Sequence, residues 1–384
     1  MKVLIAIDSF KGSVSSIEGS QAIAEGVKEV YPNSEIIRLP LADGGEGTVD
    51  ALVQATDGTK IDVEVTGPLQ DKVIATYGIT GDRKTAVIEV ASACGLTLVP
   101  VEKRNPLETT SYGVGELILD AIHRGCREFI IGLGGSATND AGIGMLQALG
   151  IQFLDKNGKQ VGLGGQILQT IEKIEIESLN TSIQNCTFRI ACDVTNPLCG
   201  PNGAAYVYGP QKGATSKTIE ELDNGLKHFA EVVKTSMNQD INSIPGAGAA
   251  GGLGAAFFGF LDGTLQSGVE IVLDAIQMEK HMEGADFVIT GEGRLDGQTS
   301  MGKAPIGVSK LARNKNIPVI ALAGSTTYDT SILHEYGITS CFSITNEPMS
   351  LEKAMQPEIA QANLQTTTSQ IFRLIKATRN KEEE

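Results

Sequence analysis

Apolar residues near the start of the chain occur in short continuous runs that alternate with stretches of helical spacing. Residues 2–7, 35–39 and 60–66 are runs of strand length, while residues 17–30 carry apolar side chains at helical spacing and a second helix is expected over 46–55. Continuous apolar runs separated by amphipathic helices are typical of buried parallel strands with helical crossovers. The first 66 residues therefore predict an α/β arrangement with three parallel strands.

The pattern changes near residue 73. Two strand-like runs, 73–79 and 85–90, are joined by Thr80-Gly81-Asp82-Arg83-Lys84, which predicts a β-hairpin. A hairpin requires antiparallel strands, so a second sheet of mixed direction begins here. We expect this sheet to include strands at 129–133 and 188–194, with helices near 114–123, 141–149 and 218–235.

Regular alternation of strands and helices returns near residue 286. Strands are expected at 286–290, 318–323 and 340–344, with helices at 305–314, at 331–336 and in a long amphipathic segment toward residue 376. The fold class predicted is α/β, with a doubly wound parallel sheet domain and an inserted mixed α/β domain. In this interpretation residues 1–62 and 286–384 form the discontinuous doubly wound domain, and residues 63–285 form the insertion. Two separate domains are the alternative.

Charge narrows the choice of partner. The 384 residues include 31 Lys and Arg against 46 Asp and Glu, a formal net charge of -15. Such a protein repels the phosphate backbone of nucleic acid and the surface of anionic membranes, so neither is expected as a partner. A small anionic substrate can bind only where local cations and backbone N–H groups overcome this field. The basic residues beside glycine-rich loops are therefore informative.

Cysteine and histidine usage limits the chemistry. The six cysteines include no C-x-x-C pair, and the four histidines include no H-x-x-x-H or H-x-E pattern. We expect reduced core thiols in a cytoplasmic protein and no zinc site. Any metal is expected to be a hard cation on oxygen ligands. The apolar run after Lys2 is too short for a signal peptide, which also favours a cytoplasmic location.

Ligands of open α/β sheets bind at the carboxyl ends of the strands, so the loops there are candidate sites. The first loop, 8–13, offers Asp8, Lys11 and hydroxyl groups, although a serine there could simply cap the next helix. The second loop, 42–48, holds Asp43 and Glu46 among three glycines. A turn needs one or two glycines, so this density indicates close approach to a ligand.

Two further loops follow strands of the expected insertion. The third contains small and polar residues whose backbone N–H groups would converge at a helix start, which makes it the strongest single phosphate candidate. Its candidate residues are Gly134, Gly135, Ser136, Thr138 and Asn139. The fourth loop places Asp193 after an apolar strand, where it is either an active-site acid or the acceptor of an Asx-turn before a proline.

The fifth loop, 290–305, is the richest in chemical groups. Arg294, Thr299 and Lys303 suit phosphate, and Glu292 and Asp296 suit a cation. Residues 297–303 match G-x-x-x-x-G-K, but Ala304 stands where a Walker A loop needs Ser or Thr for the metal. We therefore expect a long phosphate-handling loop that is not a true P-loop.

Together these loops resemble the bacterial-type, or type 1, glycerate kinase family. The similarity covers essentially the whole chain in order, and the strings are long enough to be far more specific than any one glycine motif. It is carried by residues 8–12, 42–48, 132–140, 193–198, 248–254, 291–296 and 302–303. The resemblance implies a doubly wound domain with an inserted mixed α/β domain, and phosphorylation of D-glycerate by ATP with Mg²⁺. By family analogy, 2-phosphoglycerate is favoured over 3-phosphoglycerate as product.

Phosphoryl transfer needs charge neutralisation on the phosphates, a metal and a group that accepts the hydroxyl proton. By residue type and loop position, Asp193 is the expected general base and the 134–139 backbone is expected to hold phosphate. We assign the binding of anionic groups of ATP or glycerate to Lys11, Arg294 and Lys303. We assign the binding of the metal to Asp43, Glu46, Glu292 and Asp296.

Two other classes of function use similar loops. A non-catalytic sensor of phosphorylated metabolites would share the anion sites, but it has little need for so many loop carboxylates. A phosphatase or phosphomutase would need a nucleophile, for which Asp8 is the candidate. Glycerate-dependent release of ADP from ATP separates the kinase from both alternatives.

Overall fold

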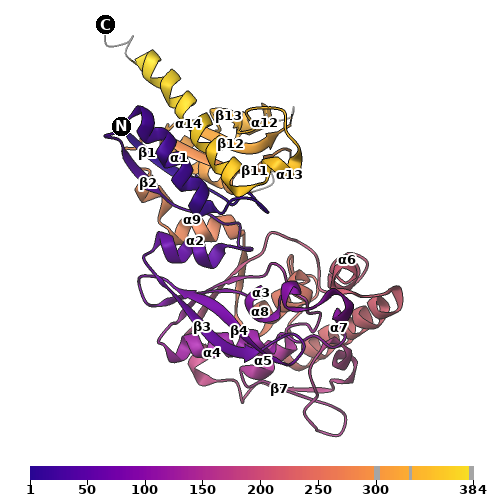
Figure 1. Ribbon diagram of the computed structural model, residues 1–384. Helices are drawn as coiled ribbons and strands as arrows, with labels where there is room; N and C mark the ends of the chain where they lie inside the picture. The colour runs from indigo at the N-terminus through magenta and orange to yellow at the C-terminus, as the bar shows by residue number, and fades with distance from the viewer. Residues whose placement is uncertain (298–302, 328–330, 380–384) are drawn as a thin grey trace. The chain divides into compact units, whose positions relative to one another are not determined.

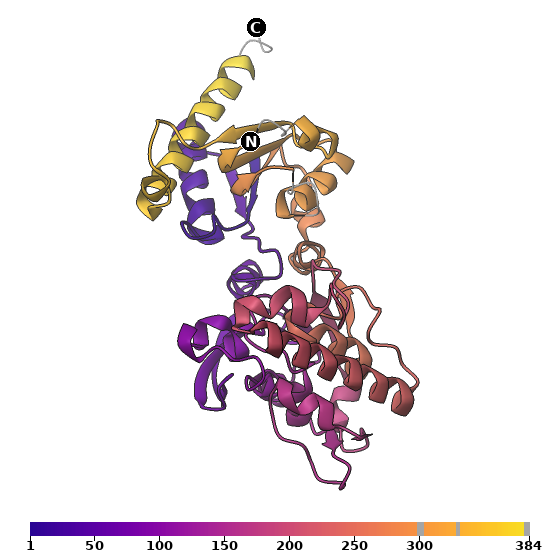
Figure 2. The same cartoon turned by 90° about the vertical axis from the view of Figure 1, so that its right-hand side faces the viewer.

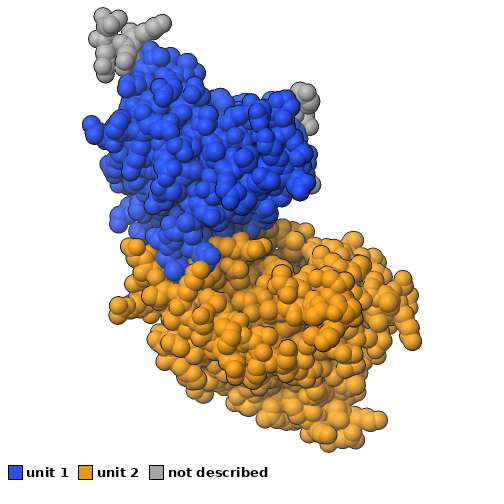
Figure 3. All heavy atoms as spheres, viewed as in Figure 1, with its two compact units in different colours: residues 1–43, 50–56, 269–384 blue, residues 44–49, 57–268 orange. Residues whose placement is uncertain are grey.

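The computed structural model describes residues 1–297, 303–327 and 331–379. The chain divides into two compact units, each coloured separately in Figure 3. Unit 1 comprises residues 1–43, 50–56 and 269–384, and unit 2 comprises residues 44–49 and 57–268. Both units combine a sheet with helices, so the predicted α/β class is confirmed. Within the described residues, no helix has both the length and the apolar character needed to cross a membrane.

Unit 1 is built on a five-stranded parallel sheet in the order β13-β12-β11-β1-β2. Counted along unit 1 alone, this is the order 2-1-3-4-5 of doubly wound flavodoxin-like folds, whose topological switch point lies between the first and third strands. Here those strands are β1 and β11. The strands are β1 (Lys2–Ile7), β2 (Glu35–Arg38), β11 (Phe287–Leu295), β12 (Val319–Thr326) and β13 (Ser340–Ser343).

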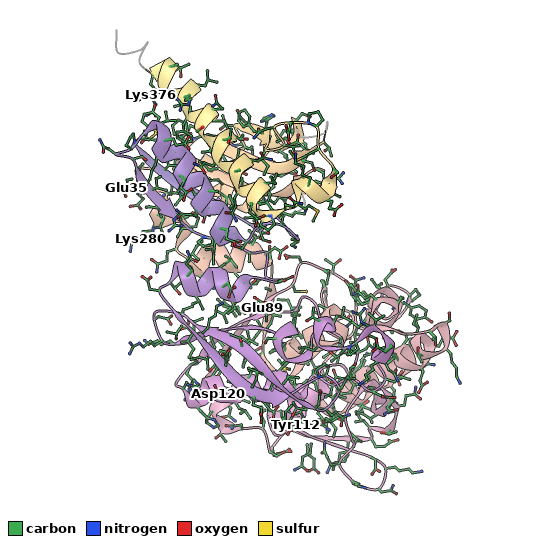
Figure 4. All side chains as sticks on the ribbon, viewed as in Figure 1. Glu35, Glu89, Tyr112, Asp120, Lys280 and Lys376 are labelled. Atoms are coloured by element: carbon green, nitrogen blue, oxygen red, sulfur yellow. The ribbon has the colours of Figure 1, made fainter. Side chains whose placement is uncertain are left out.

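Helices cover both faces of this sheet. α1 (Ser16–Val30) and α14 (Pro357–Arg379) lie side by side on one face (Figures 1 and 2), and α11 (Ala304–Asn314) packs against β11 on the other. The ammonium of Lys376, labelled in Figure 4, lies 5.6 Å from the ring centre of Tyr31, which ties α14 to the end of α1. The remaining helices of this unit are α9 (Gly268–Ala275), α10 (Met278–His281), α12 (Ser331–Glu335) and α13 (Leu351–Ala354), while α2 (Thr48–Ala55) contributes its residues from Asp50 onward.

Unit 2 contains a six-stranded mixed sheet in the order β10-β9-β6-β5-β4-β3, with a separate β7-β8 ribbon. The predicted hairpin is confirmed, since β4 and β5 pair antiparallel, and β5, β6, β9 and β10 are mutually parallel. The strands are β3 (Thr59–Thr66), β4 (Lys72–Ile79), β5 (Thr85–Glu89), β6 (Glu128–Gly132), β7 (Gln152–Leu154), β8 (Lys173–Glu175), β9 (Thr187–Ala191) and β10 (Thr264–Gln266). The helices are α3 (Ala91–Cys94), α4 (Tyr112–His123), α5 (Ile143–Ala148), α6 (Ala204–Tyr208), α7 (Ser216–Met237) and α8 (Leu253–Leu261).

Two sequence predictions were wrong in ways that affect the site. The strand near 60–66 is not a third parallel strand beside β1, because β3 pairs antiparallel with β4 along its full length in the sheet of unit 2. The strand that begins near 286 does not end at 290. β12 continues beside β11, with Glu292 paired to Ala323 and Arg294 to Ser325, so the ladder satisfies backbone groups as far as Leu295. The first part of the expected fifth loop, residues 290–295, is therefore strand.

The limits of the units differ from the predicted domain limits. Segment 44–49 joins unit 2, and the chain returns to unit 1 at residue 269, before the predicted limit at residue 286. The early return includes α9, whose Val269 and Leu273 lie against Gly307 of α11. The division into a discontinuous domain and an insertion at 62/63 and 285/286 stays a prediction.

Candidate functional site

Unit 1 contains a cavity of about 600 Å³ at the carboxyl edge of its sheet. It is lined by residues that follow β1, by the end of β11 and by segments after β12 and β13. This edge includes the switch point between β1 and β11, where crossovers leave a crevice in doubly wound sheets. The volume lies within the usual range for small-molecule sites.

Asp8 is a buried acid of this cavity with a raised pKa. It directly follows β1 and is 5% exposed, its backbone N–H bonds to the Gly291 carbonyl, and its Oδ1 accepts a 2.6 Å hydrogen bond from the N–H of Ser9. Burial first, and then repulsion by Asp43, raise the pKa of Asp8 to about 6. A buried carboxylate whose charge is disfavoured in this way would be stabilised by a cation.

Lys11 and Asp43 form an ion pair in which Lys11 Nζ lies 2.9 Å from Asp43 Oδ2. Burial lowers the pKa of Lys11, but its hydrogen bond to Asp43 and the negative charge there outweigh this effect and raise it above the usual value. The Lys11 side chain is 69% exposed. An exposed pair of this kind is worth about 0 to 1 kcal/mol, so either group can exchange its partner for a ligand at little cost.

Glu292, within β11, meets Lys303 at the start of α11. Glu292 is 7% exposed, and Lys303 Nζ lies 3.4 Å from its Oε2. Arg294 also lines the cavity, and its Nε lies 3.2 Å from Asp296 Oδ2. The structure thus brings together Lys11, Arg294 and Lys303, three of the four predicted catalytic residues. Asp296 is not among the lining residues, and Thr299 falls outside the described residues.

The predicted four-carboxylate metal set is not assembled within unit 1. Asp43 and Glu292 line the cavity together with Asp8, which the sequence did not place in this set, whereas Glu46 belongs to unit 2. The described residues contain no cluster of three or more His, Cys, Asp or Glu side chains suited to hold a metal by themselves. Mg²⁺ usually takes only one or two carboxylates and completes its shell with water and substrate phosphates, so this donor set is compatible with it.

In unit 2, three loops gather at the carboxyl edge of β5, β6 and β9. A Cβ atom on Gly44 would lie 2.5 Å from that of Ala191, so only glycine lets this backbone approach the end of β9. Glu89, labelled in Figure 4, ends β5 and accepts a 2.9 Å hydrogen bond from the N–H of Val49. Segment 44–49, with its exposed Glu46, is therefore fixed beside the loop after β6.

The loop after β6 is held by a buried carboxylate at the start of α5. Asp140 is fully buried and accepts hydrogen bonds from Ser111 N–H and Oγ and from the N–H groups of Gly142 and Gly144 at the start of α5. Burial outweighs these hydrogen bonds and raises the pKa of Asp140 above its usual value. The helix start that was expected to bind phosphate is thus capped by the protein's own carboxylate. Of residues 134–139, only Gly134 and Gly135 are exposed.

Two side chains in this region were missed by the sequence analysis. Lys212 is 2% exposed and donates hydrogen bonds to Ser136 Oγ at 3.0 Å and to the Thr138 carbonyl at 2.6 Å. Burial lowers its pKa to about 8. Asn139 is fully buried, and neither polar atom of its amide has a partner among the described residues. No sequence signal separates Lys212 from a surface lysine, because its burial depends on packing against a distant loop.

Asp193 is exposed. β9 ends at Ala191, and Asp193 lies two residues beyond it, where its Oδ1 accepts a 3.1 Å hydrogen bond from the N–H of Gly268. The strand is shorter than predicted because β10, its neighbour, covers only Arg189 to Ala191. Asp193 nevertheless lies at the carboxyl edge of the sheet, as expected for a candidate acid.

Comparison with known proteins agrees with this architecture. The sequence profile of the glycerate kinase family matches residues 3–376. A protein of Escherichia coli K12 named glycerate 2-kinase is 51% identical over 356 residues, which is 93% of each chain. A glycerate kinase of Bacillus cereus is 49% identical over 371 residues, or 97% of each chain. A crystal structure from Salmonella typhimurium LT2, of a protein provisionally assigned as glycerate kinase 2, has a TM-score of 0.90, 46% identity and 99% coverage of both chains.

Proposed function

Because this chain belongs to the glycerate kinase family, we propose that it transfers the γ-phosphate of ATP to the 2-hydroxyl group of D-glycerate. The products are 2-phosphoglycerate and ADP. Family membership supports the acceptor and the reaction class. The choice of the 2-hydroxyl is supported by the name of the Escherichia coli relative, which is 51% identical.

The cavity of unit 1 is the observation that supports a nucleoside triphosphate as the phosphate donor. In a chain with a net charge of -15, it gathers Lys11, Arg294 and Lys303 around one space. Transfer of a phosphoryl group depends mainly on positioning and on neutralisation of phosphate charge, and three cations supply that charge. Buried carboxylates at the same place would repel phosphate unless a metal intervened.

Two ion pairs whose members both line the cavity suit this exchange. Lys11 is paired with Asp43, and Lys303 with Glu292. When phosphate enters, each ammonium can turn to a phosphate oxygen, and each released carboxylate can accept a cation. Asp43 and Glu292 are therefore the residues that would hold Mg²⁺ with the nucleotide. The metal would neutralise charge on the phosphates.

Unit 2 supplies the remaining roles of this proposal. Asp193 accepts the proton of the glycerate hydroxyl as the oxygen–phosphorus bond forms and the bond from the γ-phosphorus to the β-phosphate oxygen breaks. The exposed Gly134 and Gly135 offer backbone N–H groups to an anionic group of the substrate. Glu46, which is also exposed, remains a candidate to bind the metal or to lie next to it. Lys212 acts indirectly, since it holds the loop that carries these glycines.

The six cysteines support a cytoplasmic location for this reaction. All six are free thiols in the structure. Reduced thiols are typical of the cytosol, where glutathione and thioredoxin prevent disulfide formation.

The test is to incubate the protein with ATP, Mg²⁺ and D-glycerate and to measure release of ADP. We expect ADP to form rapidly only when glycerate is present, and phosphorus NMR to show 2-phosphoglycerate. Samples without glycerate and with EDTA are the controls. Equal ADP release with and without glycerate would contradict the kinase assignment, and a 3-phosphoglycerate signal would contradict the assigned position.

A further inference from the structure

The cavity of unit 1 has a second half that the phosphate chemistry does not use. This half is formed by Met349, Leu351 and Met355, which lie between β13 and α14 in the sequence. The side chains are apolar, yet Leu351 is 75% exposed and both methionines are only partly buried. Exposed apolar surface that lines a concave site is typical of a place that a ligand covers.

The two halves of the cavity are continuous. A Cβ atom on Gly12 would lie 2.9 Å from the terminal methyl carbon of Met355, so this methionine lies over the loop that carries Lys11. A ligand that fills the cavity therefore meets cations as well as thioether and aliphatic groups. A nucleotide has this polarity, with phosphates on one side and a flat aromatic base on the other.

The apolar half also suits a base by its side-chain types. Methionine is flexible and makes favourable contacts between its sulfur and aromatic rings, so two methionines can adapt to the faces of a planar ligand. Asn363 of α14 lines the same cavity and accepts a 3.2 Å hydrogen bond from Asn346 through its Oδ1. With Oδ1 so engaged, the Nδ2 group of Asn363 is a donor suited to the ring nitrogen of a base.

We propose that Met349, Leu351 and Met355, together with Asn363, form the subsite for the purine base of the phosphate donor. This inference rests on the proposed function, because it takes the donor to be a nucleoside triphosphate. It implies that unit 1 by itself provides the contacts to both ends of the nucleotide. The base therefore contributes affinity through contacts that are independent of Lys11 and Lys303.

The experiment compares the binding of ADP and of inorganic tripolyphosphate to the full-length protein by calorimetry in the presence of Mg²⁺. The variant Leu351→Ala/Met355→Ala shortens the apolar half, whereas Lys303→Ala changes the charged half. Leu374→Ala is the matched control, because Leu374 is an exposed leucine of α14 that does not line the cavity. Thermal melting of each variant checks that it is folded.

We expect the double variant to bind ADP at least tenfold more weakly and to bind tripolyphosphate within twofold of the unmodified protein. Lys303→Ala should weaken both ligands, and Leu374→Ala neither. If the unmodified protein binds ADP and the double variant binds it equally well, the subsite is wrong while the proposed function stands. Equal weakening of ADP and tripolyphosphate by the double variant would also overturn it. If the unmodified protein binds neither ADP nor tripolyphosphate, both proposals fail.

Discussion

Lys212 and Thr138 are joined by a buried hydrogen bond of 2.6 Å between the lysine ammonium and the threonine carbonyl. The two residues are 74 positions apart in the sequence. The same ammonium reaches Ser136, so one buried cation holds the backbone and a side chain of the loop after β6. Burying a lysine is unfavourable unless its donors are satisfied, which indicates that the geometry of this loop matters.

Lys212→Met should separate loop geometry from stability. The substitution has two opposing effects on stability. It removes a buried charge, whose pKa of about 8 instead of 10.5 corresponds to roughly 3 kcal/mol against the charged form, and it also removes two hydrogen bonds, which costs a similar amount. We therefore expect the free energy of unfolding to change by less than about 2 kcal/mol. The kcat should fall about tenfold or more. Hydrogen exchange should accelerate at residues 134–139. Lys217→Met, at an exposed position of α7, is the control, and unchanged kcat in Lys212→Met would remove the loop from the reaction.

The same lysine predicts a dependence of stability on pH. Its folded pKa lies near 8, below its usual value of 10.5, so between these values the unfolded chain binds more protons than the folded one. The contribution of Lys212 to stability therefore rises as the pH increases from 8 toward 10.5. Between pH 7.5 and 9.5, the unfolding free energy of the unmodified protein should gain about 2 kcal/mol relative to Lys212→Met. Urea titrations of both proteins at both pH values measure this change. If the difference in unfolding free energy between the two proteins is the same at both pH values, Lys212 is not buried as a cation.

Lys303→Ala tests the charged half of the unit 1 cavity. If Lys303 exchanges Glu292 for a phosphate oxygen, its loss removes a charge-assisted hydrogen bond of about 1.5 to 3 kcal/mol. The KM for ATP should then rise, or kcat fall, by about tenfold or more, with little change in the KM for glycerate. Lys315→Ala, beyond the other end of α11, is the matched control. Normal ATP kinetics in Lys303→Ala would show that Lys303 is a surface lysine with no part in ATP binding.

Asp193→Asn tests the assigned base. Asparagine keeps an oxygen that can accept the hydrogen bond from Gly268, but it cannot accept the substrate proton. General-base assistance is typically worth about 10² to 10⁴ in rate, so kcat should fall by about 10² or more while the melting temperature stays unchanged. Asp240→Asn is the control, since Asp240 is another exposed loop carboxylate of unit 2 that accepts a backbone hydrogen bond. If the variant turns over normally but melts at a lower temperature, Asp193 serves only as the acceptor of an Asx-turn. Asp43 would then be the next candidate for the general base.

The candidate site could be predicted in part. Asp8, Lys11 and Lys303 were identified because each lies next to the end of a strand or the start of a helix, and such positions follow from local patterns. The exposure of Asp193 and the hydrogen bonds that Ser111 donates to Asp140 could not be predicted this way. Both depend on which distant backbone groups happen to lie nearby, and no local pattern encodes that.

The sequence by itself determined many of the strands and helices, such as β1, α1 and α11, because the spacing of apolar residues is a local property that these elements retain in the fold. Only the tertiary structure decided that β3 pairs with β4, that β11 extends to Leu295 beside β12, and that Lys212 is buried against Thr138. The pairing of β11 with β12 and the burial of Lys212 depend on contacts between segments that are separated in the chain. β3 and β4 are close in the chain, but which sheet they enter is decided by the strands they meet there. Their free energy comes from burial and hydrogen bonding that exist only once those segments meet.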